Sequence, residues 1–596
     1  MRFPWSARTE GGATGLAVGG PEITSSEAHP DNKNDVFNPT VHDGIGSSSD
    51  EDKPSEDAQH GVQAVEAVTL VWSKTQLILA YTFIFLVFFT ISLQQQIQNN
   101  LSYYVTSSFA LLPLVGTSSI VSSIVGGVSR LPIAKFIDLI GRAEGFAIMT
   151  GCAVIGLIMM AACRNVETYA AGQVFYWLGF DGMMYVLNVF MADTSSLKDR
   201  ALVFAFSTTP YIATTWAGPP AAASFLKTSG WPWGYGAFAI ITPAIALPIL
   251  ILLWVNQRKA ERQGLIKKIP SGRTFGESFN YYFWEFDVIG LVLVSAGFVL
   301  FLLPFSLASY QKKGWGAGMI IAMLVIGICC LIAFAFYEKF FAKKSFIPFS
   351  LLTDSSVWGA CFCAAFFFIS FYCWDSYFYN YLQAVHNLSV THAGYVSNIY
   401  SIGSCFWAVV IAYLIRVTGR FKWLALYFAV PMQVLGVGLM IYFRQPNHNI
   451  GYVIMCQIFI AFSGGTIVIC EEMAVMAAAP HQNVASMLAL IGLFTSVGGA
   501  IGVAISGAIY TNKFPAALAT KISNATLAAE LYGSLPVQLE YPLGSPERDA
   551  VIYAYGDSMK WLAVAGTVFL IPCFFFVAIW KDFKVKEMRQ VKGTVA

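Results

Sequence analysis

Charged side chains are scarce in this sequence. Asp, Glu, Lys and Arg make up 12% of its 596 residues, whereas 56% belong to the hydrophobic set. A soluble globular protein carries about 25% charged residues. This composition, with a mean hydropathy of +0.60, excludes a soluble enzyme and any disordered or coiled-coil class, and it predicts a polytopic membrane protein. The net charge of +2 gives no reason to expect a nucleic-acid partner.

Cysteine is absent from the connecting loops, because all eleven cysteines lie inside apolar runs. A disulfide framework needs loop cysteines, and a zinc site needs a tight CxxC-type spacing. The seven histidines lie in the N-terminal tail, in loops or at helix ends, so they form no intramembrane cluster of metal ligands. The sequence has no nucleophile–base arrangement and no phosphate-binding GxxxxGKS or GxxxxGKT motif. We expect no enzyme, no ATP-driven pump, no cofactor and no metal site.

Apolar periodicity is absent from residues 1–68, which hold twelve Asp or Glu and four Lys or Arg among many Gly, Ser and Pro. Such a segment cannot bury enough surface to offset its chain entropy, so we expect a disordered, acidic cytoplasmic tail. The tail has no apolar or Arg-rich stretch at its start. No cleavable signal peptide is therefore expected, and the first membrane helix is expected to act as the targeting signal.

From Gln76 onward, apolar runs of about 20 residues follow one another, each long enough to cross a hydrocarbon core of about 30 Å. Fourteen membrane helices are predicted, which places both termini on the same side. They lie at about 76–97, 107–132, 144–163, 169–192, 201–225, 233–255, 287–308, 317–337, 357–381, 392–415, 423–443, 450–471, 484–510 and 560–580.

Positive charge indicates which side that is. With cytoplasmic termini, the inner segments hold 26 Lys and Arg and the outer loops nine, while Arg130 lies within a helix. Cytoplasmic loops carry the excess of Lys and Arg, so we expect cytoplasmic termini. The three usable glycosylation sequons, at Asn100, Asn387 and Asn524, then fall in outer loops.

An internal repeat divides the membrane part. Residues 133–142 (IAKFIDLIGR) and 411–420 (IAYLIRVTGR) are identical at five of ten positions, with an offset of 278. Two like halves around a midplane binding site are typical of a secondary transporter. The predicted divisions are a six-helix half at 69–255, a cytoplasmic linker at 256–286, two inserted helices at 287–340, a second six-helix half at 341–580 with an outer loop at 512–558, and a basic cytoplasmic tail at 581–596.

Two motifs resemble those of the major facilitator superfamily. In the loop between helices 2 and 3, Asp138, Gly141 and Arg142 match its signature, although a Gly and two basic residues of the signature are replaced. Residues 216–220 (WAGPP) are similar to the Gly-Pro motif of fourteen-helix members. Gly and Pro there permit a kink and a close helix contact. The resemblance implies an all-α membrane protein with the major facilitator fold and 14 transmembrane helices.

Residues 70–590 resemble one branch of this superfamily, the fungal siderophore–iron transporters. The stretches that carry this resemblance are 93–98 (LQQQIQ) with Tyr103 and Tyr104, 179–185 (GFDGMMY), 218–220 (GPP), Glu471 with Glu472, and a tyrosine-bearing outer loop before the last helix. The resemblance implies proton-coupled uptake of ferric hydroxamate siderophores. Periodicity alone predicts a secondary transporter of an unknown solute.

A ferric trihydroxamate surrounds its iron with its own oxygen atoms, so its carrier should supply aromatic walls and neutral hydrogen-bonding groups in place of metal ligands. The repeat offset places residues 94–98 and 372–376 at equivalent depths of the two halves. The predicted cavity residues are Gln94, Gln95, Gln98, Tyr185, Asn188, Tyr211, Trp216, Tyr372, Trp374, Tyr377 and Tyr400. The alternatives are an interfacial aromatic belt for Trp374 and Tyr377 and plain packing for other aromatic residues.

Two carboxylates are candidates for proton coupling. Asp181 lies near mid-membrane, where a carboxylate is costly and indicates a functional site by default. Desolvation favours the neutral form of a carboxyl group, which suits reversible protonation. Asp375 is the second candidate. The alternative for Asp181 is a structural acid that pairs with a basic residue or with a helix backbone.

Charged residues at the inner ends of the helices predict a gate. Asp193 ends helix 4, and the repeat offset leads from it to Glu471. With Asp138, Arg142 and Arg420, these residues are expected to form two symmetry-related acid–base sets. Alternating access requires such a bistable element, which holds the inner side closed and then breaks. The alternative is that these are helix-end charges that reach into water.

The outer loop at 512–558 is long, with a surface helix expected at 515–530. Long loops without regular structure are usually functional or disordered. In the resembling family this region helps to admit the siderophore, so we assign a lid role to Tyr541, Tyr553 and Tyr555.

Together these features predict a monomeric importer of ferric siderophores and protons in the plasma membrane, or also in endosomal or vacuolar vesicles. One alternative is a proton antiporter that exports drugs or exchanges glutathione; for glutathione, only Arg130 lies near enough to supply the positive charge it needs. A second alternative is a sensor that binds siderophore without moving it.

Overall fold

The computed structural model describes residues 71–108, 127–264, 274–308, 311, 313–341, 351 and 353–588. The predicted tail at 1–68 lies outside them, as do the side chains of Asn100, Tyr103 and Tyr104. Every regular element in the described ranges is a helix, which confirms the predicted fold class. Eleven of these helices are long and apolar enough to cross a membrane, and a shorter apolar helix covers Val288–Pro304. The count of fourteen spans stays a prediction.

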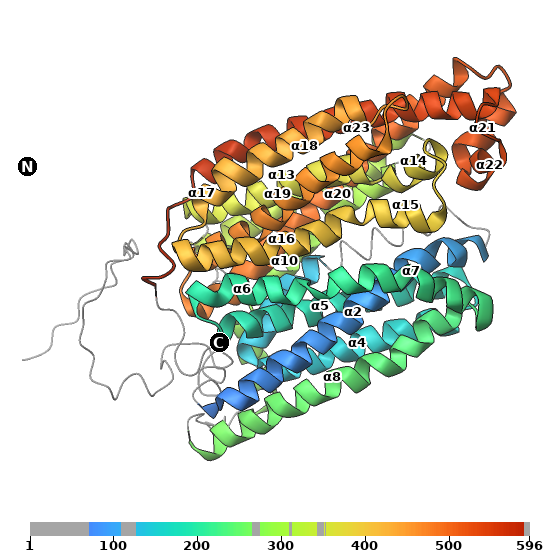
Figure 1. The fold of residues 1–596 in the computed structure, drawn as a ribbon. Coiled ribbons are helices and arrows are strands. Elements are labelled where there is room, and N and C mark those ends of the chain that lie inside the picture. The colour runs from blue at the N-terminus through green and yellow to red at the C-terminus, as the bar shows by residue number, and fades with distance from the viewer. Residues whose placement is uncertain are drawn as a thin grey trace, which may run out of the picture. The chain divides into compact units, whose positions relative to one another are not determined.

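The first half forms the lower group of helices, coloured blue to green, in Figure 1. It comprises α2 (Lys74–Ser108), a helical segment at 127–139, α4 (Arg142–Ala162), α5 (Val166–Asp193), α6 (Leu197–Thr208), α7 (Pro210–Thr228) and α8 (Trp231–Arg262). Glycines allow α4 and α5 to pack backbone against backbone. A Cβ added to Gly179 would lie 2.1 Å from the backbone nitrogen of Ala153, and one added to Gly156 would lie 2.3 Å from that of Tyr176.

The helix predicted at 201–225 is divided into α6 and α7, which meet at Thr209. Pro210 causes this break, because it has no N–H group to donate to the backbone of α6. The Gly-Pro motif lies farther along, inside α7. A Cβ added to Gly218 would lie only 2.5 Å from the Cβ of Gln96 on α2. Gly218 therefore permits the close helix contact that the motif predicted.

The inserted pair comprises α10 (Val288–Leu307) and α11 (Gly318–Phe340), preceded by α9 (Phe275–Glu285). The second half follows and forms the upper group, yellow to red, in Figure 1. It comprises α13 (Ser355–Asp375), α14 (Phe378–Ala384), α15 (Val390–Ser397), α16 (Ile399–Thr418), α17 (Lys422–Leu424), η3 (Ala425–Ala429), α18 (Val430–Phe443), α19 (Ile450–Ala478), η4 (His481–Asn483), α20 (Val484–Ala519), α21 (Ala525–Gly533), α22 (Leu535–Glu540) and α23 (Pro546–Ala578).

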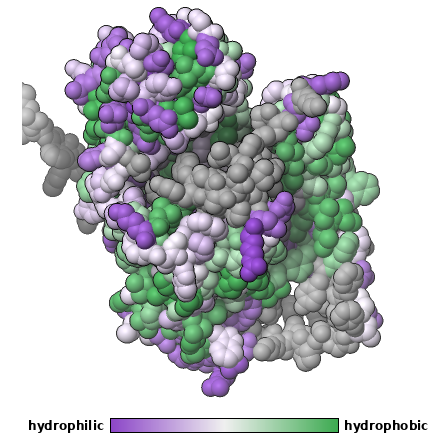
Figure 2. Space-filling model, turned by 90° about the vertical axis from the view of Figure 1, so that its right-hand side faces the viewer, coloured by the Kyte–Doolittle hydropathy of each residue, from purple (hydrophilic) through white to green (hydrophobic). Residues whose placement is uncertain are grey.

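We call the end of the helices that carries Asp138, Asp193 and His481 the inner end, and the end that carries α21 and α22 the outer end. Figure 2 looks onto the outer end, where hydrophilic residues gather over the second half while hydrophobic residues cover much of the flanks. The predicted loop at 512–558 is mostly helical, because α20 continues to Ala519 and α23 begins at Pro546. Ser545 caps α23 and Pro546 occupies its first turn, a helix-start signal that precedes the apolar run.

Candidate functional site

Arg142 lies at the centre of a buried charge cluster at the inner end. Its Nη1 donates a hydrogen bond to Oδ1 of Asp138 (2.7 Å), and its Nε donates to Oδ2 of Asp193 (3.0 Å). All three side chains are at most 5% exposed. Burial raises the pKa of Asp138 to about 6, although Arg142 opposes this shift. The structure therefore brings together the acid–base set predicted for the first half.

The matching set of the second half is not formed. Arg420 is half-exposed and pairs with Asp582 (3.0 Å). Glu471 is buried, and its Oε2 has no hydrogen-bond partner among the described residues. The reason lies in the repeat, because its offset leads from Asp138 to Arg416. The second copy therefore carries a second cation where the first has a carboxylate, and the predicted symmetry of the gate is wrong.

Two side-chain contacts join the halves at the inner end. Nε of Arg416 on α16 lies 2.7 Å from Oδ1 of Asp199 on α6. Nε2 of His481, between α19 and α20, lies 3.7 Å from Oδ1 of Asp193. Sequence reasoning did not predict Asp199, Arg416 and His481 as contacts between the halves. The reversed charge at Arg416 was the available signal, because a cation at the repeat position of a carboxylate needs a different partner.

Tyr185 also joins the halves, although it was predicted to line the cavity. Its side chain is buried, and its hydroxyl donates to the backbone oxygen of Ala485 on α20 (2.6 Å). Asn188, one turn farther along α5, is half-buried, and its Oδ1 has no hydrogen-bond partner among the described residues. Tyr185 is therefore a contact between helices, whereas Asn188 has a buried oxygen atom that no described residue satisfies.

A second charged pair lies nearer the middle of the helices. Nη2 of Arg130, on the segment 127–139, lies 2.9 Å from Oδ1 of Asp181 on α5. A Cβ added to Gly492 on α20 would lie 2.4 Å from Nη1 of Arg130, so the guanidinium reaches the second half. Glu472 on α19 interacts electrostatically with Arg130. Asp181, the first coupling candidate, is thus ion-paired where the two halves meet.

The predicted glutamines of α2 take different roles. Gln94 and Gln98 are buried. Nε2 of Gln94 donates to Oε1 of Gln98 (3.0 Å), and Oε1 of Gln94 accepts from the hydroxyl of Tyr176. Gln95 is half-buried, and its Oε1 accepts from the hydroxyl of Tyr211 (2.8 Å). The cavity prediction therefore suits Gln95, whereas Gln94 and Gln98 face the interior of the first half.

Half-buried tyrosines gather around the two coupling candidates. Tyr372 interacts electrostatically with both Asp181 and Asp375, and Tyr211 interacts with Asp181. Tyr400 interacts with Asp375 and with Tyr372. These electrostatic interactions relate polar and aromatic residues of the two halves to one another, as expected for a shared cavity.

The sequence matches the Major Facilitator Superfamily over residues 77–345 and 336–503. It is 54% identical to the MFS siderochrome iron transporter 1 of Ajellomyces capsulatus over 91% of this chain and 93% of that protein. It is 49% identical to the siderochrome iron transporter 2 of Aspergillus fumigatus over 90% and 89% of the two chains. The chain belongs to the siderophore–iron transporters of the major facilitator superfamily. It is therefore a multi-pass membrane transporter and not an enzyme.

Solved structures agree on the fold of this transporter. The MFS proton:xylose symporter XylE bound to 6-bromo-6-deoxy-D-glucose matches with a TM-score of 0.52 and 13% identity, over 87% of this chain and 99% of that one. The human organic anion transporter MFSD10 (TETRAN) matches with a TM-score of 0.51 and 12% identity, over 82% and 98%. At these identities the likeness shows the major facilitator fold alone.

Three aromatic residues of the transporter that were predicted to line the cavity pack against other aromatic rings. Trp374 is fully buried in the second half and packs edge-on against neighbouring rings. Trp216 is 50% exposed and packs on Tyr395 of the other half, with ring centroids 4.7 Å apart. Tyr377 stacks on Tyr510 at 3.9 Å. Trp374 is thus neither a cavity wall nor a residue of an interfacial belt, because its surroundings are packed protein.

Two of the three tyrosines that were predicted to form a lid are buried or half-buried against neighbouring helices. Tyr555 is buried, and its hydroxyl donates to Oε1 of Gln538 on α22 (3.1 Å). Tyr541 is half-buried, and Tyr553 is 51% exposed. Arg548, which sequence reasoning missed, is buried, and its guanidinium donates to backbone oxygens of α14 and α22. Only Tyr553 has the exposure expected of a lid residue.

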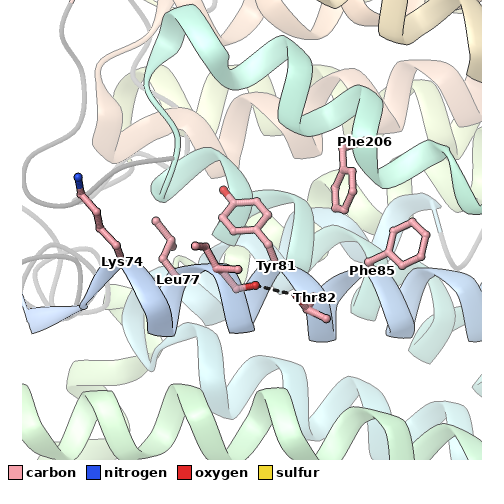
Figure 3. A pocket seen from close by; sticks show the side chains of 7 residues that line it. Lys74, Leu77, Tyr81, Thr82, Phe85 and Phe206 are labelled. Atoms are coloured by element: carbon pink, nitrogen blue, oxygen red, sulfur yellow. Dashed lines mark hydrogen bonds between the residues drawn. The ribbon is translucent and has the colours of Figure 1, made fainter.

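A separate groove of about 700 Å³ lies between α2 and α6 (Figure 3) and contains none of the predicted site residues. Its lining is apolar apart from Lys74, Tyr81 and Thr82. Among the described residues, no group of three or more His, Cys, Asp or Glu is placed to hold a metal ion. Of the sequons, Asn387 is exposed, Asn524 caps α21 through its side-chain oxygen, and Asn100 lies outside the described side chains.

Proposed function

We propose that this transporter imports ferric hydroxamate siderophores by proton symport through alternating access. The observation that carries this proposal is the 54% identity to an MFS siderochrome iron transporter over nearly the whole of both chains. The site supports it with neutral donors and acceptors. Gln95 with Tyr211, Tyr372 and Tyr400 offer amide and phenol groups that suit the amide and hydroxamate rim of such a chelate.

Proton coupling is assigned to Asp181, with Asp375 as a second site. A proton on Asp181 removes the charge that holds Arg130 at 2.9 Å and so weakens a contact at the meeting point of the halves. The gate comprises the Arg142 cluster with Asp138 and Asp193. Its contact to His481 of the second half (3.7 Å) has to break when the inner end opens.

The glutathione alternative depends on the positive charge of Arg130. An anionic peptide needs a cation that is not already compensated, whereas the guanidinium of Arg130 is paired with Asp181. This pairing favours a neutral or weakly charged substrate in the same region.

The transporter is proposed to lie in the plasma membrane, as a monomer, with both termini cytoplasmic. The inner end then faces the cytoplasm, and the exposed sequons at Asn387 and Asn524 face outward. For the two halves, the linker, the inserted pair and the tails, we propose the boundaries that the sequence predicts.

Uptake measurements test the proposed function. One proton that moves through 100 mV gains about 2.3 kcal/mol, which drives roughly 40-fold accumulation. We express this chain in cells that lack siderophore carriers of their own. These cells are expected to accumulate a radio-iron-loaded trihydroxamate to an inside-to-outside concentration ratio of at least this order. A protonophore should reduce accumulation to the level of untransfected cells. Correct surface expression without accumulation of any ferric hydroxamate would favour the exporter.

Gln95→Ala is expected to weaken the apparent affinity for the ferric hydroxamate. The substitution removes the side-chain amide whose Oε1 accepts the hydrogen bond of Tyr211. In our proposal this hydrogen-bonded pair faces the cavity. The loss of one such neutral hydrogen bond is worth about 0.5–1.5 kcal/mol, or roughly a 2- to 13-fold higher half-saturation concentration in uptake assays. Gln98→Ala is the matched control, because Gln98 is buried within the first half. An equal affinity loss in both variants would contradict the assignment.

A further inference from the structure

The groove between α2 and α6 has a charged mouth and an aromatic deep end. Tyr81 lies along its floor, where its hydroxyl is 3.0 Å from Oγ1 of the buried Thr194 at the end of α5. Phe85 of α2 and Phe206 of α6 meet at the deep end, with ring centroids 5.2 Å apart. Figure 3 shows these two rings at one end of the groove and Lys74 at the other.

The groove has the depth of one membrane leaflet. The membrane-crossing part of α2 begins at Lys74. At a rise of about 1.5 Å per residue, α2 advances about 16 Å from Lys74 to Phe85, which is about half of a hydrocarbon core of about 30 Å. Ile78, which lines the groove, and its neighbour Leu79 are both exposed. An exposed apolar surface at this depth faces lipid, so the groove opens toward the acyl chains of one leaflet.

The walls of the groove are apolar beyond its mouth. The hydroxyl of Thr82 donates to the backbone oxygen of Ile78 (2.9 Å), and the hydroxyl of Tyr81 is paired with Thr194. The remaining lining residues between mouth and deep end carry hydrocarbon side chains, namely Leu77, Ile78, Phe85 and Phe206. A polar ligand would lose its hydrogen bonds to water along such walls, whereas a hydrocarbon chain loses none. The walls therefore suit an acyl chain.

Positive charge gathers at the mouth. Lys74 is exposed and takes part in no hydrogen bond or ion pair within the described part of the chain. Nζ of Lys259, at the end of α8, lies 3.4 Å from the backbone oxygen of Val71, three residues before Lys74. The sequence of α2 contains no carboxylate, and the one carboxylate of α6, Asp199, is paired with Arg416 (2.7 Å). Neither helix that forms the groove therefore supplies an anion to Lys74.

We propose that this groove binds one anionic phospholipid from the leaflet at the inner end. Its phosphate-bearing headgroup binds Lys74 at the mouth, with Lys259 nearby, and one acyl chain lies along α2 as far as Phe85 and Phe206. Such a lipid has its charge at the membrane surface and its chain at membrane depth, so it matches both the cations and the apolar walls. With the orientation proposed above, this leaflet is the cytoplasmic one, which carries the anionic lipids.

A lipid in this groove would also contact the helix that joins the halves at the inner end. Phe206 and Asp199 both belong to α6, and Asp199 binds Arg416 of the second half. A ligand that binds only the folded chain raises its stability by mass action. Phosphatidylserine is therefore expected to raise the unfolding temperature of the unchanged chain more than that of Lys74→Gln.

Native mass spectrometry of the purified full chain in detergent tests the site directly. The probes are phosphatidylserine and phosphatidylcholine with identical acyl chains, titrated separately. One lysine near the membrane surface strengthens the binding of an anionic headgroup by roughly 5-fold. The first phosphatidylserine is expected to bind more tightly than the first phosphatidylcholine by roughly this factor or more, and Lys74→Gln should lower the ratio by roughly 5-fold. Lys339→Gln, an exposed change in the last turn of α11, should leave it unchanged.

Ile78→Trp tests the apolar part of the groove. The larger indole at this exposed position fills the space of the acyl chain and removes no charge, so the affinity for phosphatidylserine is expected to fall. Leu79→Trp is the matched control, because Leu79 is exposed on the same helix and lies outside the lining. Soluble glycerol 3-phosphate, which has the phosphate but no chains, should not displace the bound lipid.

Three results would overturn the proposal. Equal affinities of the unchanged chain for the two lipids would show unselective coating by membrane lipid. A phosphatidylserine preference that Lys74→Gln leaves intact would place the headgroup elsewhere. Displacement by glycerol 3-phosphate, or equal effects of Ile78→Trp and Leu79→Trp, would show that the groove does not hold the chain. These measurements contain no siderophore, so they decide on the lipid site whatever the transported solute is.

Discussion

Arg142→Ala is expected to lower the free energy of unfolding by about 3–5 kcal/mol, because removal of one partner leaves buried charges uncompensated. The guanidinium binds Asp138 and Asp193 at 2.7 and 3.0 Å, and all three side chains are nearly inaccessible. The same change frees Asp193, which also contacts His481 of the other half. We therefore expect a population shift toward the inward-open form, measured as altered cysteine labelling from the two sides of the membrane.

Arg420→Ala provides the matched control from the second copy of the repeat. Arg420 and its partner Asp582 are 47% and 46% exposed, and an exposed ion pair contributes about 0–1 kcal/mol. Thermal unfolding of both purified variants in the same detergent measures the difference. Equal losses for Arg142→Ala and Arg420→Ala would show that the buried cluster does not hold the inner end together.

The first copy of the repeat could be predicted from the sequence because its residues lie close together in the chain. Asp138 and Arg142 are four residues apart, on the two sides of the short turn between the segment 127–139 and α4, so the chain itself holds them close together. The second copy was predicted by analogy, and the analogy failed at one residue. Arg416 stands where Asp138 stands in the first copy, and its partner Asp199 comes from the other half. A contact between distant segments has no local signal in the sequence.

The sequence predicted which types of residue would line the candidate cavity, but it did not predict the direction in which each side chain points. The glutamines of α2 were recognised as unusual polar residues in a membrane helix. The structure buries Gln94 and Gln98 and leaves Gln95 half-buried. Tyr176 on α5 donates a hydrogen bond to Gln94, which in turn donates to Gln98, and this partner on another helix has no local signal in the sequence. Trp374 shows the same limit, since the buried residues of α13 are mostly apolar and give the helix no polar face to orient it.

The outer end shows what a composition argument leaves out. The sequence predicted a long outer loop with a surface helix at 515–530 and a Gly- and Pro-rich stretch after it, whereas the described chain there is mainly α21, α22 and the extensions of α20 and α23. Arg548 holds this arrangement together. Nε donates to the oxygen of Ala384 (2.8 Å), and Nη2 donates to that of Gln383 (3.1 Å). Nη1 donates to the oxygen of Gln538.

Arg548→Ala is accordingly expected to loosen the outer end. Arg548 is 1% exposed and satisfies the last carbonyls of α14 and α22, which have no partners within their own helices. Each buried acceptor left without a donor costs about 1–3 kcal/mol, so we expect a loss of roughly 3 kcal/mol or more. Hydrogen exchange should increase in α14, α21 and α22, while the inner end stays protected.

Arg548→Lys should restore only part of this protection, because an ammonium group is a point donor that lacks the planar fork of the guanidinium. Asp549→Asn is the matched control, since Asp549 is exposed in the same first turn of α23 and contributes only about 0.3–1 kcal/mol through the helix dipole. If exchange in α21 and α22 is unchanged by Arg548→Ala, packing alone holds the outer end. The other outcome is that exchange increases and siderophore uptake is lost while binding persists. The ordered outer end is then needed for siderophore entry, and the lid comprises the whole of α21 and α22 in place of Tyr555.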